Sequence, residues 1–197
     1  PGKILVLGAG VVGTNAARVG LGLGMETVVI NKDTAGIQRI DELFKGRVRA
    51  LPVSAHTLEE EIVGADVVIG AVLVPGGRTP VLITRDMLGT MKKGSVIVDV
   101  AVDQGGCVET TRPTTHDDPV YVVDGIVHYC VANMPGAYPR TSTIALTNAT
   151  LPYIKLLTNN GIEKTIAEDA AIRSALNTYQ GTIMNRALAE TVGDETS

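Results

Sequence analysis

Six residues near the start of the chain limit its possible folds. Residues 8–13 read Gly-Ala-Gly-Val-Val-Gly and directly follow the apolar run Ile4–Leu7. A G-x-G-x-x-G pattern between a predicted strand and a predicted helix is typical of a dinucleotide-binding turn. In such a turn Gly8 allows the tight bend, Gly10 admits the pyrophosphate close to the backbone, and Gly13 lets the helix pack on the strand. The alternative is a tight strand–helix turn that binds no ligand.

The helix that follows supplies the other half of the predicted phosphate site. It runs from about Val11 to Leu23. Its first N–H groups, including those of Val11 and Val12, have no partner within the helix, and they lie at the positive end of the helix dipole. We therefore predict that this turn and the helix N-terminus bind the phosphates of a dinucleotide.

Strands and helices keep alternating beyond the turn, which indicates an α/β fold. The further predicted strands are Thr27–Ile30, Val48–Val53, 66–72, Ser95–Val100, Tyr121–Asp124 and His128–Ala132, and the further predicted helices are a stretch around Ile37–Phe44, Leu58–Val63 and Thr84–Met91. Strands that are apolar on both faces are typical of a parallel sheet. We predict a Rossmann-type doubly wound parallel sheet over residues 1–140, and a helical extension without further strands over residues 141–197.

Composition excludes several classes of function. The chain has 197 residues, 45% of them hydrophobic, and a formal net charge of -4. This charge does not favour nucleic acid or an anionic membrane surface as a partner. The apolar runs are too short to span a bilayer, and no signal segment opens the chain, so we expect a cytoplasmic protein. Since a buried strand begins almost at Pro1, the chain is expected to be cut from a longer protein.

The residue after the second predicted strand bears on the choice of cofactor. Nicotinamide-binding folds usually place an acid there to bind the ribose hydroxyls, but this chain has Asn31. Asparagine does not repel a 2′-phosphate, and Lys32 follows it. NADP is therefore not excluded beside NAD. Asp33 would become the ribose ligand if the strand end were shifted by two residues; the alternative for residues 31–33 is a solvated turn.

Several long motifs are more specific than secondary-structure propensity alone can explain. They are residues 66–76 (DVVIGAVLVPG), 98–107 (VDVAVDQGGC), 112–116 (RPTTH) and 128–136 (HYCVANMPG). Together they make the chain resemble the alanine dehydrogenases over nearly its whole length. The nucleotide domain of the proton-pumping transhydrogenases is similar in fold but lacks the Asp-Gln-Gly-Gly-Cys loop. The resemblance to the alanine dehydrogenases is therefore the stronger of the two.

The resemblance implies a set of cofactor contacts. Besides the three glycines, it places Val72 and Leu73 on the adenosine side, Val102 and Asp103 beside the nicotinamide, and Asn133 and Met134 at its carboxamide end. This chain departs from the family pattern at three positions. Asn31 replaces the ribose aspartate, Gly36 stands where a basic residue is common, and Val53 stands where a serine often lies. These departures concern cofactor affinity and choice.

Asp103 is the candidate catalytic residue. It matches the catalytic aspartate of the family, and it follows an apolar run in a position where ligands collect in open α/β sheets. Asp99 in the same predicted strand is the rival. The histidines share no metal-ligand spacing with a carboxylate or with Cys107, so no metal site is expected. Cys107 and Cys130 are expected to stay thiols.

The resemblance also implies an activity, partners and an assembly. The implied reaction is the reversible, NAD-dependent conversion of L-alanine to pyruvate and ammonia by a homo-oligomer, a hexamer in this family. The family's substrate-carboxylate ligand and catalytic histidine lie ahead of the glycine turn, so residues 1–197 alone are expected to be inactive. The family's chain also returns from the nucleotide domain to the substrate domain, so the resemblance implies that residues 141–197 belong to the substrate domain. The alternatives are a nucleotide-binding module of transhydrogenase type and a non-catalytic paralogue.

Overall fold

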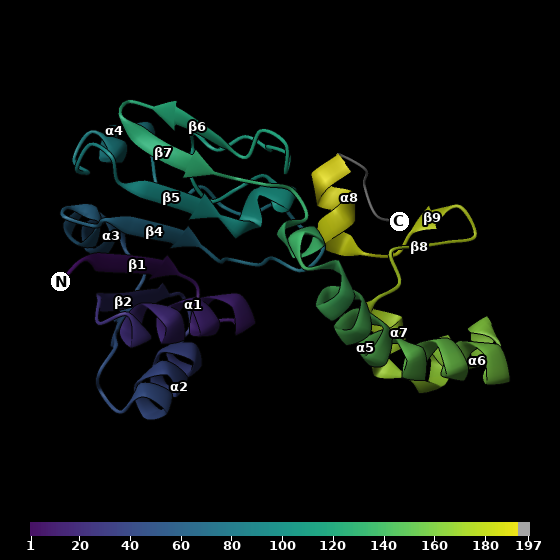
Figure 1. The fold of residues 1–197 in the computed structure, drawn as a ribbon. Helices are drawn as coiled ribbons and strands as arrows, with labels where there is room; N and C mark the ends of the chain where they lie inside the picture. The colour runs from purple at the N-terminus through teal and green to yellow at the C-terminus, as the bar shows by residue number, and fades with distance from the viewer. Residues whose placement is uncertain (193–197) are drawn as a thin grey trace. The chain divides into compact units, whose positions relative to one another are not determined.

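A computed structural model of the chain describes residues 1–192, which form two compact units. The first unit holds residues 1–74 and 78–134, and the second holds residues 75–77 and the described residues from 135 to 192. The first contains β1 (Lys3–Leu7), α1 (Val11–Gly22), β2 (Glu26–Asn31), α2 (Thr34–Phe44), β3 (Arg49–Pro52), α3 (Ala55–Ile62), β4 (Val67–Gly70), α4 (Arg85–Leu88), β5 (Val96–Asp99), the 3-10 helix η1 (Val100–Gln104), β6 (Val120–Val123) and β7 (Ile126–Tyr129) (Figure 1).

The strands of the first unit form one seven-stranded sheet in the order β3-β2-β1-β4-β5-β7-β6. Every neighbouring pair is parallel except β6 and β7, which form an antiparallel hairpin at one edge. The doubly wound α/β fold predicted from the sequence is confirmed. The sheet is mostly parallel rather than wholly so, because residues 124 and 125 join β6 to β7 in a turn that is too short for a crossover.

Helices cover both faces of this sheet. Alternate residues of β1 point to opposite faces, so Ile4 and Val6 belong to one apolar cluster, whereas Leu5 and Leu7 belong to the other. Ala17 of α1 and Ile40 and Phe44 of α2 pack in the first cluster. Leu58 and Ile62 of α3 and Leu88 of α4 pack in the second. This two-sided burial explains why the central strands read as continuous apolar runs.

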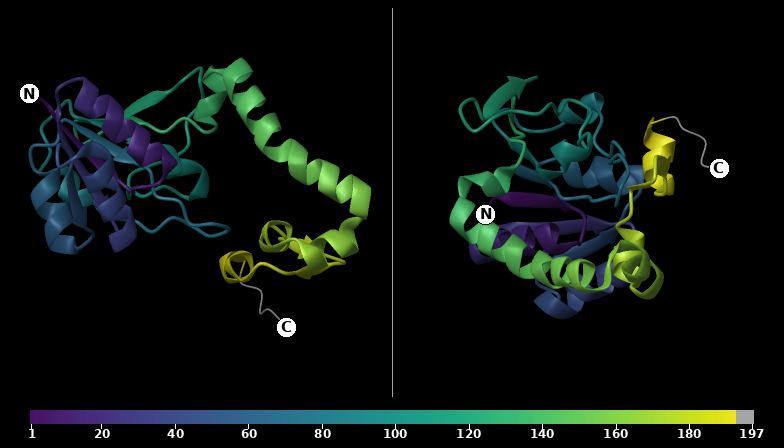
Figure 2. Two further views of the ribbon diagram at one scale, coloured as in Figure 1. Left: turned by 90° about the horizontal axis from the view of Figure 1, so that it is seen from below. Right: turned by 90° about the vertical axis from the view of Figure 1, so that its right-hand side faces the viewer.

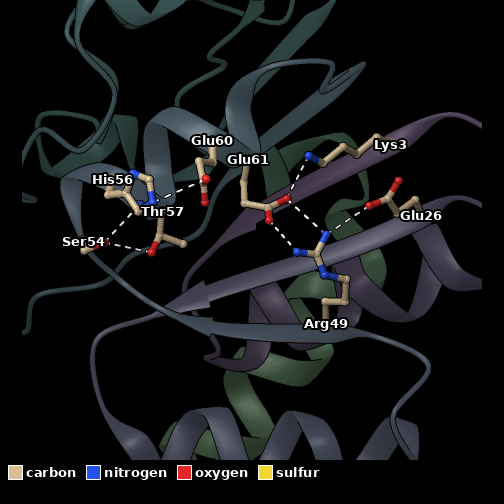
Figure 3. Close-up of polar contacts among 8 residues, drawn as sticks. All are labelled: Lys3, Glu26, Arg49, Ser54, His56, Thr57, Glu60 and Glu61. Carbon is tan, nitrogen blue, oxygen red and sulfur yellow. Dashed lines mark hydrogen bonds and ion pairs between the residues drawn. The ribbon is translucent and has the colours of Figure 1, made fainter.

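A charged cluster joins the amino ends of three parallel strands (Figure 3). Glu61 of α3 is 6% exposed, and its carboxylate lies 2.8 Å from Nζ of Lys3 in β1 and 2.6 Å from Nη2 of Arg49 in β3. Arg49 also pairs with Glu26 at the start of β2. Burial acts to raise the pKa of Glu61, but Lys3 and Arg49 outweigh it and lower the pKa. The cluster therefore ties α3 to the sheet at the edge opposite the carboxyl ends of the strands.

The second unit is mostly helical (Figure 2). It contains the long helix α5 (Pro139–Asn160), then α6 (Ile162–Glu168), α7 (Ala170–Ser174), β8 (Thr178–Tyr179), β9 (Thr182–Ile183) and α8 (Arg186–Val192). Residues 134–137 form a 3-10 turn, η2 (Met134–Ala137). Residues 193–197, which the sequence assigns to the helical extension, lie outside the described residues. That this unit belongs to a substrate domain stays a prediction.

Two expectations about secondary structure were wrong. The sequence predicts no strand after residue 141, but β8 and β9 form a small antiparallel hairpin. Its strands are two residues long, too short to give a periodic pattern, and the turn between them contains Gly181 at φ 83°. The helix predicted over Thr84–Met91 is only α4, capped by Thr84 as expected. No helix within residues 1–192 is long and apolar enough to cross a membrane.

We expect His128 to make the stability of the first unit sensitive to mild acid. Its side chain is fully buried in β7, where the two ring nitrogens contact the Ile126 carbonyl oxygen at 3.0 Å and Oγ1 of Thr110 at 2.8 Å. The ring stacks on Tyr121 at a centroid distance of 5.0 Å. Burial lowers the pKa of His128 below its usual 6.5. Below that pH the unfolded chain therefore binds a proton more readily than the folded chain does.

We expect the free energy of unfolding to fall as the pH drops through 6.5 toward the lower pKa of folded His128. Urea unfolding at pH 7.5 and about 5.5, for wild type and His128→Gln, measures this contribution. The loss on acidification should be smaller in the variant. An equal loss in both proteins would mean that other groups cause it.

Candidate functional site

The carboxyl ends of the parallel strands bring the predicted site residues to one edge of the sheet. Leu7 of β1 pairs with Ile30 of β2 and Gly70 of β4, and Gly70 pairs with Asp99 of β5. Asn31 is the last residue of β2, and the loops after β1, β4 and β5 carry the glycine turn, Val72 and Leu73, and Asp103. The strand order reverses direction between β1 and β4. Ligands of open α/β sheets bind at such a switch point.

The three glycines of the turn have different structural roles. Gly8 has φ 105°, and a Cβ there would come within 2.6 Å of the Ala71 carbonyl oxygen. A Cβ on Gly13 would overlap the Gly8 carbonyl oxygen. A Cβ on Gly10, by contrast, would meet none of the described atoms within 4 Å. Gly8 and Gly13 are therefore required by the fold, whereas Gly10 leaves a space in front of α1.

The start of α1 fits an anionic group in that space. Gly10 is the N-cap of the helix, and no described side chain caps its first turn. Val11 and Val12 are 81% and 45% exposed. Free N–H groups at an uncapped helix N-terminus bind phosphate. The start of α1 therefore fits the diphosphate of a dinucleotide. A side chain at residue 10 would fill the space that the diphosphate needs.

Asp103 lies in the loop after β5, which other loops hold in place. It belongs to η1, its carboxylate is exposed, and the Asn133 N–H donates to its Oδ2 at 3.4 Å. Asn133 follows β7 and has φ 54°, a conformation that asparagine tolerates. His116 contacts the Asn133 carbonyl oxygen at 3.2 Å. The structure thus brings Asp103 and Asn133 together, and their contacts with a cofactor stay a prediction.

The remaining predicted contacts differ in exposure. Leu73 is 72% exposed, while Val72 and Met134 are partly buried. Val102 is only 4% exposed, because its side chain points into the protein. Val102 therefore offers little surface to a cofactor in this structure.

Asp99 is buried and organises the loop that carries Asp103. It is 0% exposed, and its carboxylate accepts hydrogen bonds from the Ala101 N–H at 3.0 Å, the Cys107 N–H at 2.9 Å and Oγ1 of Thr111 at 2.9 Å. It also caps η1. A group so enclosed does not reach a substrate, so the rival to Asp103 holds the loop rather than the reacting atoms.

Asp99→Asn should destabilise the first unit strongly, because the new amide turns a donor toward N–H and O–H groups that need an acceptor. We expect a loss of about 3 kcal/mol in unfolding free energy and a fall of about 10 °C in Tm. Asp124→Asn is the matched control, since Asp124 forms an exposed ion pair with Arg85 and should lose less than about 1 kcal/mol. Equal Tm values for the two variants would contradict the role given to Asp99.

Sequence reasoning missed two polar residues of this edge. Arg39 of α2 donates from Nη2 to the Ala9 carbonyl oxygen in the glycine turn. The side-chain amide of Gln104 accepts from the Val74 N–H at 3.4 Å and donates to the Val74 carbonyl at 3.2 Å, which joins the loops after β4 and β5. Gln104 lies inside a motif quoted above, but Arg39 carries no sequence signal, because its contact spans thirty residues.

The cysteines and the acidic groups do not suggest other chemistry. Cys107 and Cys130 are free and buried. Burial raises the pKa of both thiols, and the nearby Asp99 carboxylate raises the pKa of Cys107 further. A raised pKa disfavours the nucleophilic thiolate form. Within residues 1–192, no group of three or more His, Cys, Asp or Glu side chains could hold a metal ion.

The fold, the glycine turn and the switch point define a doubly wound α/β protein of the dinucleotide-binding class. A family model described as "Alanine dehydrogenase/PNT, C-terminal domain" matches residues 1–186. The chain therefore belongs to the alanine dehydrogenase/PNT C-terminal domain family. An alanine dehydrogenase of Halomonas elongata is 54% identical over 99% of this chain, and the match covers 53% of that protein.

Solved structures agree with this assignment. An L-alanine dehydrogenase superposes on 98% of this chain and 53% of its own, with a TM-score of 0.84 and 45% identity. A transhydrogenase from Sinorhizobium meliloti covers 85% of this chain and 48% of its own, with a TM-score of 0.73 and 26% identity. The chain spans about half the length of the relatives it matches. The resemblance to the alanine dehydrogenases inferred from the motifs is confirmed.

Proposed function

We propose that this chain is the cofactor-binding part of an alanine dehydrogenase, which interconverts L-alanine and pyruvate with ammonia. The observation that carries the proposal is the exposed carboxylate of Asp103 at the same sheet edge as the open space beside Gly10. The first group can move a proton, and the second admits a diphosphate. Relatives that are named alanine dehydrogenase, one of them 54% identical to this chain, favour this reaction.

The proposed cofactor is NAD, which when bound accepts the hydride that leaves the Cα of alanine. Gly8 and Gly13 shape the turn, and the first N–H groups of α1 bind the diphosphate. Val72 and Leu73 lie on the adenosine side, and Asn133 and Met134 at the carboxamide end. These assignments rest on the resemblance to the alanine dehydrogenases, and the loops that carry these residues follow strands at the carboxyl edge of the sheet.

Asp103 is the proposed general acid–base group. Oxidation of the amine to an imine releases a proton from nitrogen, and addition of water to the imine carbon then gives pyruvate and ammonia. A carboxylate held near the substrate nitrogen and the attacking water can accept and return these protons. The Asn133 N–H and the cap of η1 by Asp99 fix the loop that orients it.

The finer assignments belong to the same proposal. The substrate pair is L-alanine and pyruvate, the assembly is a homo-oligomer, a hexamer by family resemblance, and the protein acts in the cytoplasm. The negative charge and pI of about 5.4 disfavour nucleic acid and anionic membrane surfaces as partners.

A transhydrogenase-type nucleotide module is the second candidate. The family model covers both kinds of protein, and a transhydrogenase matches the fold. A non-catalytic paralogue is the other alternative, because Asn31, Gly36 and Val53 depart from the family's pattern of cofactor contacts.

The test of the proposal is a calorimetric titration with NADH followed by an assay of alanine-dependent NADH formation. The preparation must include the protein's substrate-binding segment. Binding of NADH together with alanine oxidation supports the alanine dehydrogenase. NADH binding without oxidation of alanine favours the module, and failure to bind NADH refutes both.

A further inference from the structure

Asn31 is occupied in holding the glycine turn. The Ala9 N–H donates to its Oδ1 at 3.0 Å, and its Nδ2 donates to the Asp33 carbonyl oxygen at 3.1 Å and to Oδ2 of Asp33 at 2.6 Å. Both ends of the amide are therefore engaged. Asn31 is the last residue of β2 and pairs with Pro52, so the strand end is not shifted by two residues. The residue that aligns with the usual ribose acid thus has a structural task.

Asp33 places a carboxylate beside Asn31, the residue that holds the turn. It is the N-cap of α2, and its Oδ1 accepts from the Gly36 N–H at 2.6 Å. These contacts use one lone pair of each carboxylate oxygen, so both oxygens can still accept a hydroxyl. The Gly36 N–H and the Asn31 amide lower the pKa of Asp33, which keeps it ionised at neutral pH.

Gly36 belongs to the same arrangement. A Cβ at this position would overlap Nδ2 of Asn31, and it would also come within 3.2 Å of Oδ2 of Asp33. A larger residue, such as the basic one common in the family, would push the amide away from the carboxylate. The departures at residues 31 and 36 are therefore one structural change rather than two.

Two cationic residues, Arg39 and Lys32, belong to the same segment as Asp33. Arg39 binds the Ala9 carbonyl oxygen, so the Ala9 peptide is held by Asn31 on its N–H side and by Arg39 on its oxygen side. Lys32 is exposed between Asn31 and Asp33. With Asp33 ionised, their charge is partly offset; without it, they would attract a 2′-phosphate.

We propose that Asp33, two residues beyond the usual acidic position, binds the adenosine ribose hydroxyls and excludes the 2′-phosphate of NADP, while Asn31 holds the glycine turn. This inference rests on the proposed function, because it requires a nicotinamide dinucleotide in the turn. It replaces the expectation from Asn31 and Lys32 alone that cofactor choice is relaxed. Wild type should bind NADH far more tightly than NADPH.

The test is a titration of the protein with NADH and with NADPH, read by calorimetry so that no turnover is needed. In Asp33→Asn the preference for NADH over NADPH should fall at least about tenfold, because a charged acceptor is lost and a repulsion is removed. Asp41→Asn, an equal charge change at an exposed position of α2, should leave the preference unchanged. Asn31→Ala should weaken both cofactors by a similar factor, because it loosens the turn that both share.

The outcomes separate this inference from the proposed function. An unchanged NADH preference in Asp33→Asn, with NADH binding that still depends on Gly10, overturns the role of Asp33 alone. A wild type that binds NADH and NADPH equally also overturns it. NADH binding that is insensitive to Gly10→Val overturns the proposed dinucleotide site itself.

Discussion

Alanine oxidation should fall about 10²–10⁴-fold in Asp103→Asn, while the dissociation constant for NADH changes little. Asparagine keeps the size of the side chain and can still accept the 3.4 Å hydrogen bond from the Asn133 N–H, but it cannot take up a proton. The loss should therefore appear in kcat. The measurement uses the form of the protein that oxidises alanine, with steady-state kinetics at saturating substrate and NADH titration of the same samples.

A purely structural role for Asp103 gives the opposite pattern. Loss of a loop contact would lower the unfolding free energy by about 1 kcal/mol and leave kcat nearly normal. Asp86→Asn, which removes the same charge from an exposed position in α4, serves as the control and should keep both kcat and Tm. Turnover of Asp103→Asn within about threefold of wild type would move the proton transfer to another group.

Gly10→Val should lower the affinity for NADH at least about 100-fold, or roughly 2.7 kcal/mol, without unfolding the protein. Gly10 has φ -73° and ψ -166°, which valine adopts readily, and a Cβ there meets no described atom within 4 Å. The added side chain would fill the space in front of α1 that the diphosphate needs. Calorimetric titration with NADH and the unfolding midpoint of the same sample measure the two effects separately.

Gly22→Val is the matched control for this variant. Gly22 ends the same helix and also has open space at its Cβ, but it lies at the far end of α1 from the turn. NADH affinity should be unchanged in this control. If Gly10→Val bound NADH as wild type does, the glycine turn would not be the phosphate site.

The doubly wound fold could be predicted because its signals are local. Ile4–Leu7 and the glycines at 8, 10 and 13 lie in one continuous stretch, and strand, turn and helix follow from residues that are neighbours in sequence. Asp103 was found in the same way, through a distinctive motif after a buried strand. Whether it is catalytic stays a prediction, as do the cofactor contacts.

Other features depended on contacts between distant segments. The two-residue strands β8 and β9 are too short to show a period, and the antiparallel β6 looks like any other short strand until its partner is known. The separate tasks of Asp99 and Asp103 are set by burial, since one carboxylate is enclosed by three donors and the other is exposed.

Residues 31–39 illustrate the difference between what the sequence determines and what only the tertiary structure determines. The sequence alone established that an amide stands at the end of the second strand and that a carboxylate follows two positions later. Only the tertiary structure showed that the amide is engaged with Ala9, that the carboxylate is held beside it, and that Arg39 of α2 reaches the same peptide. The physical reason is that hydrogen-bond partners are chosen by distance in space, and a single sequence records only distance along the chain.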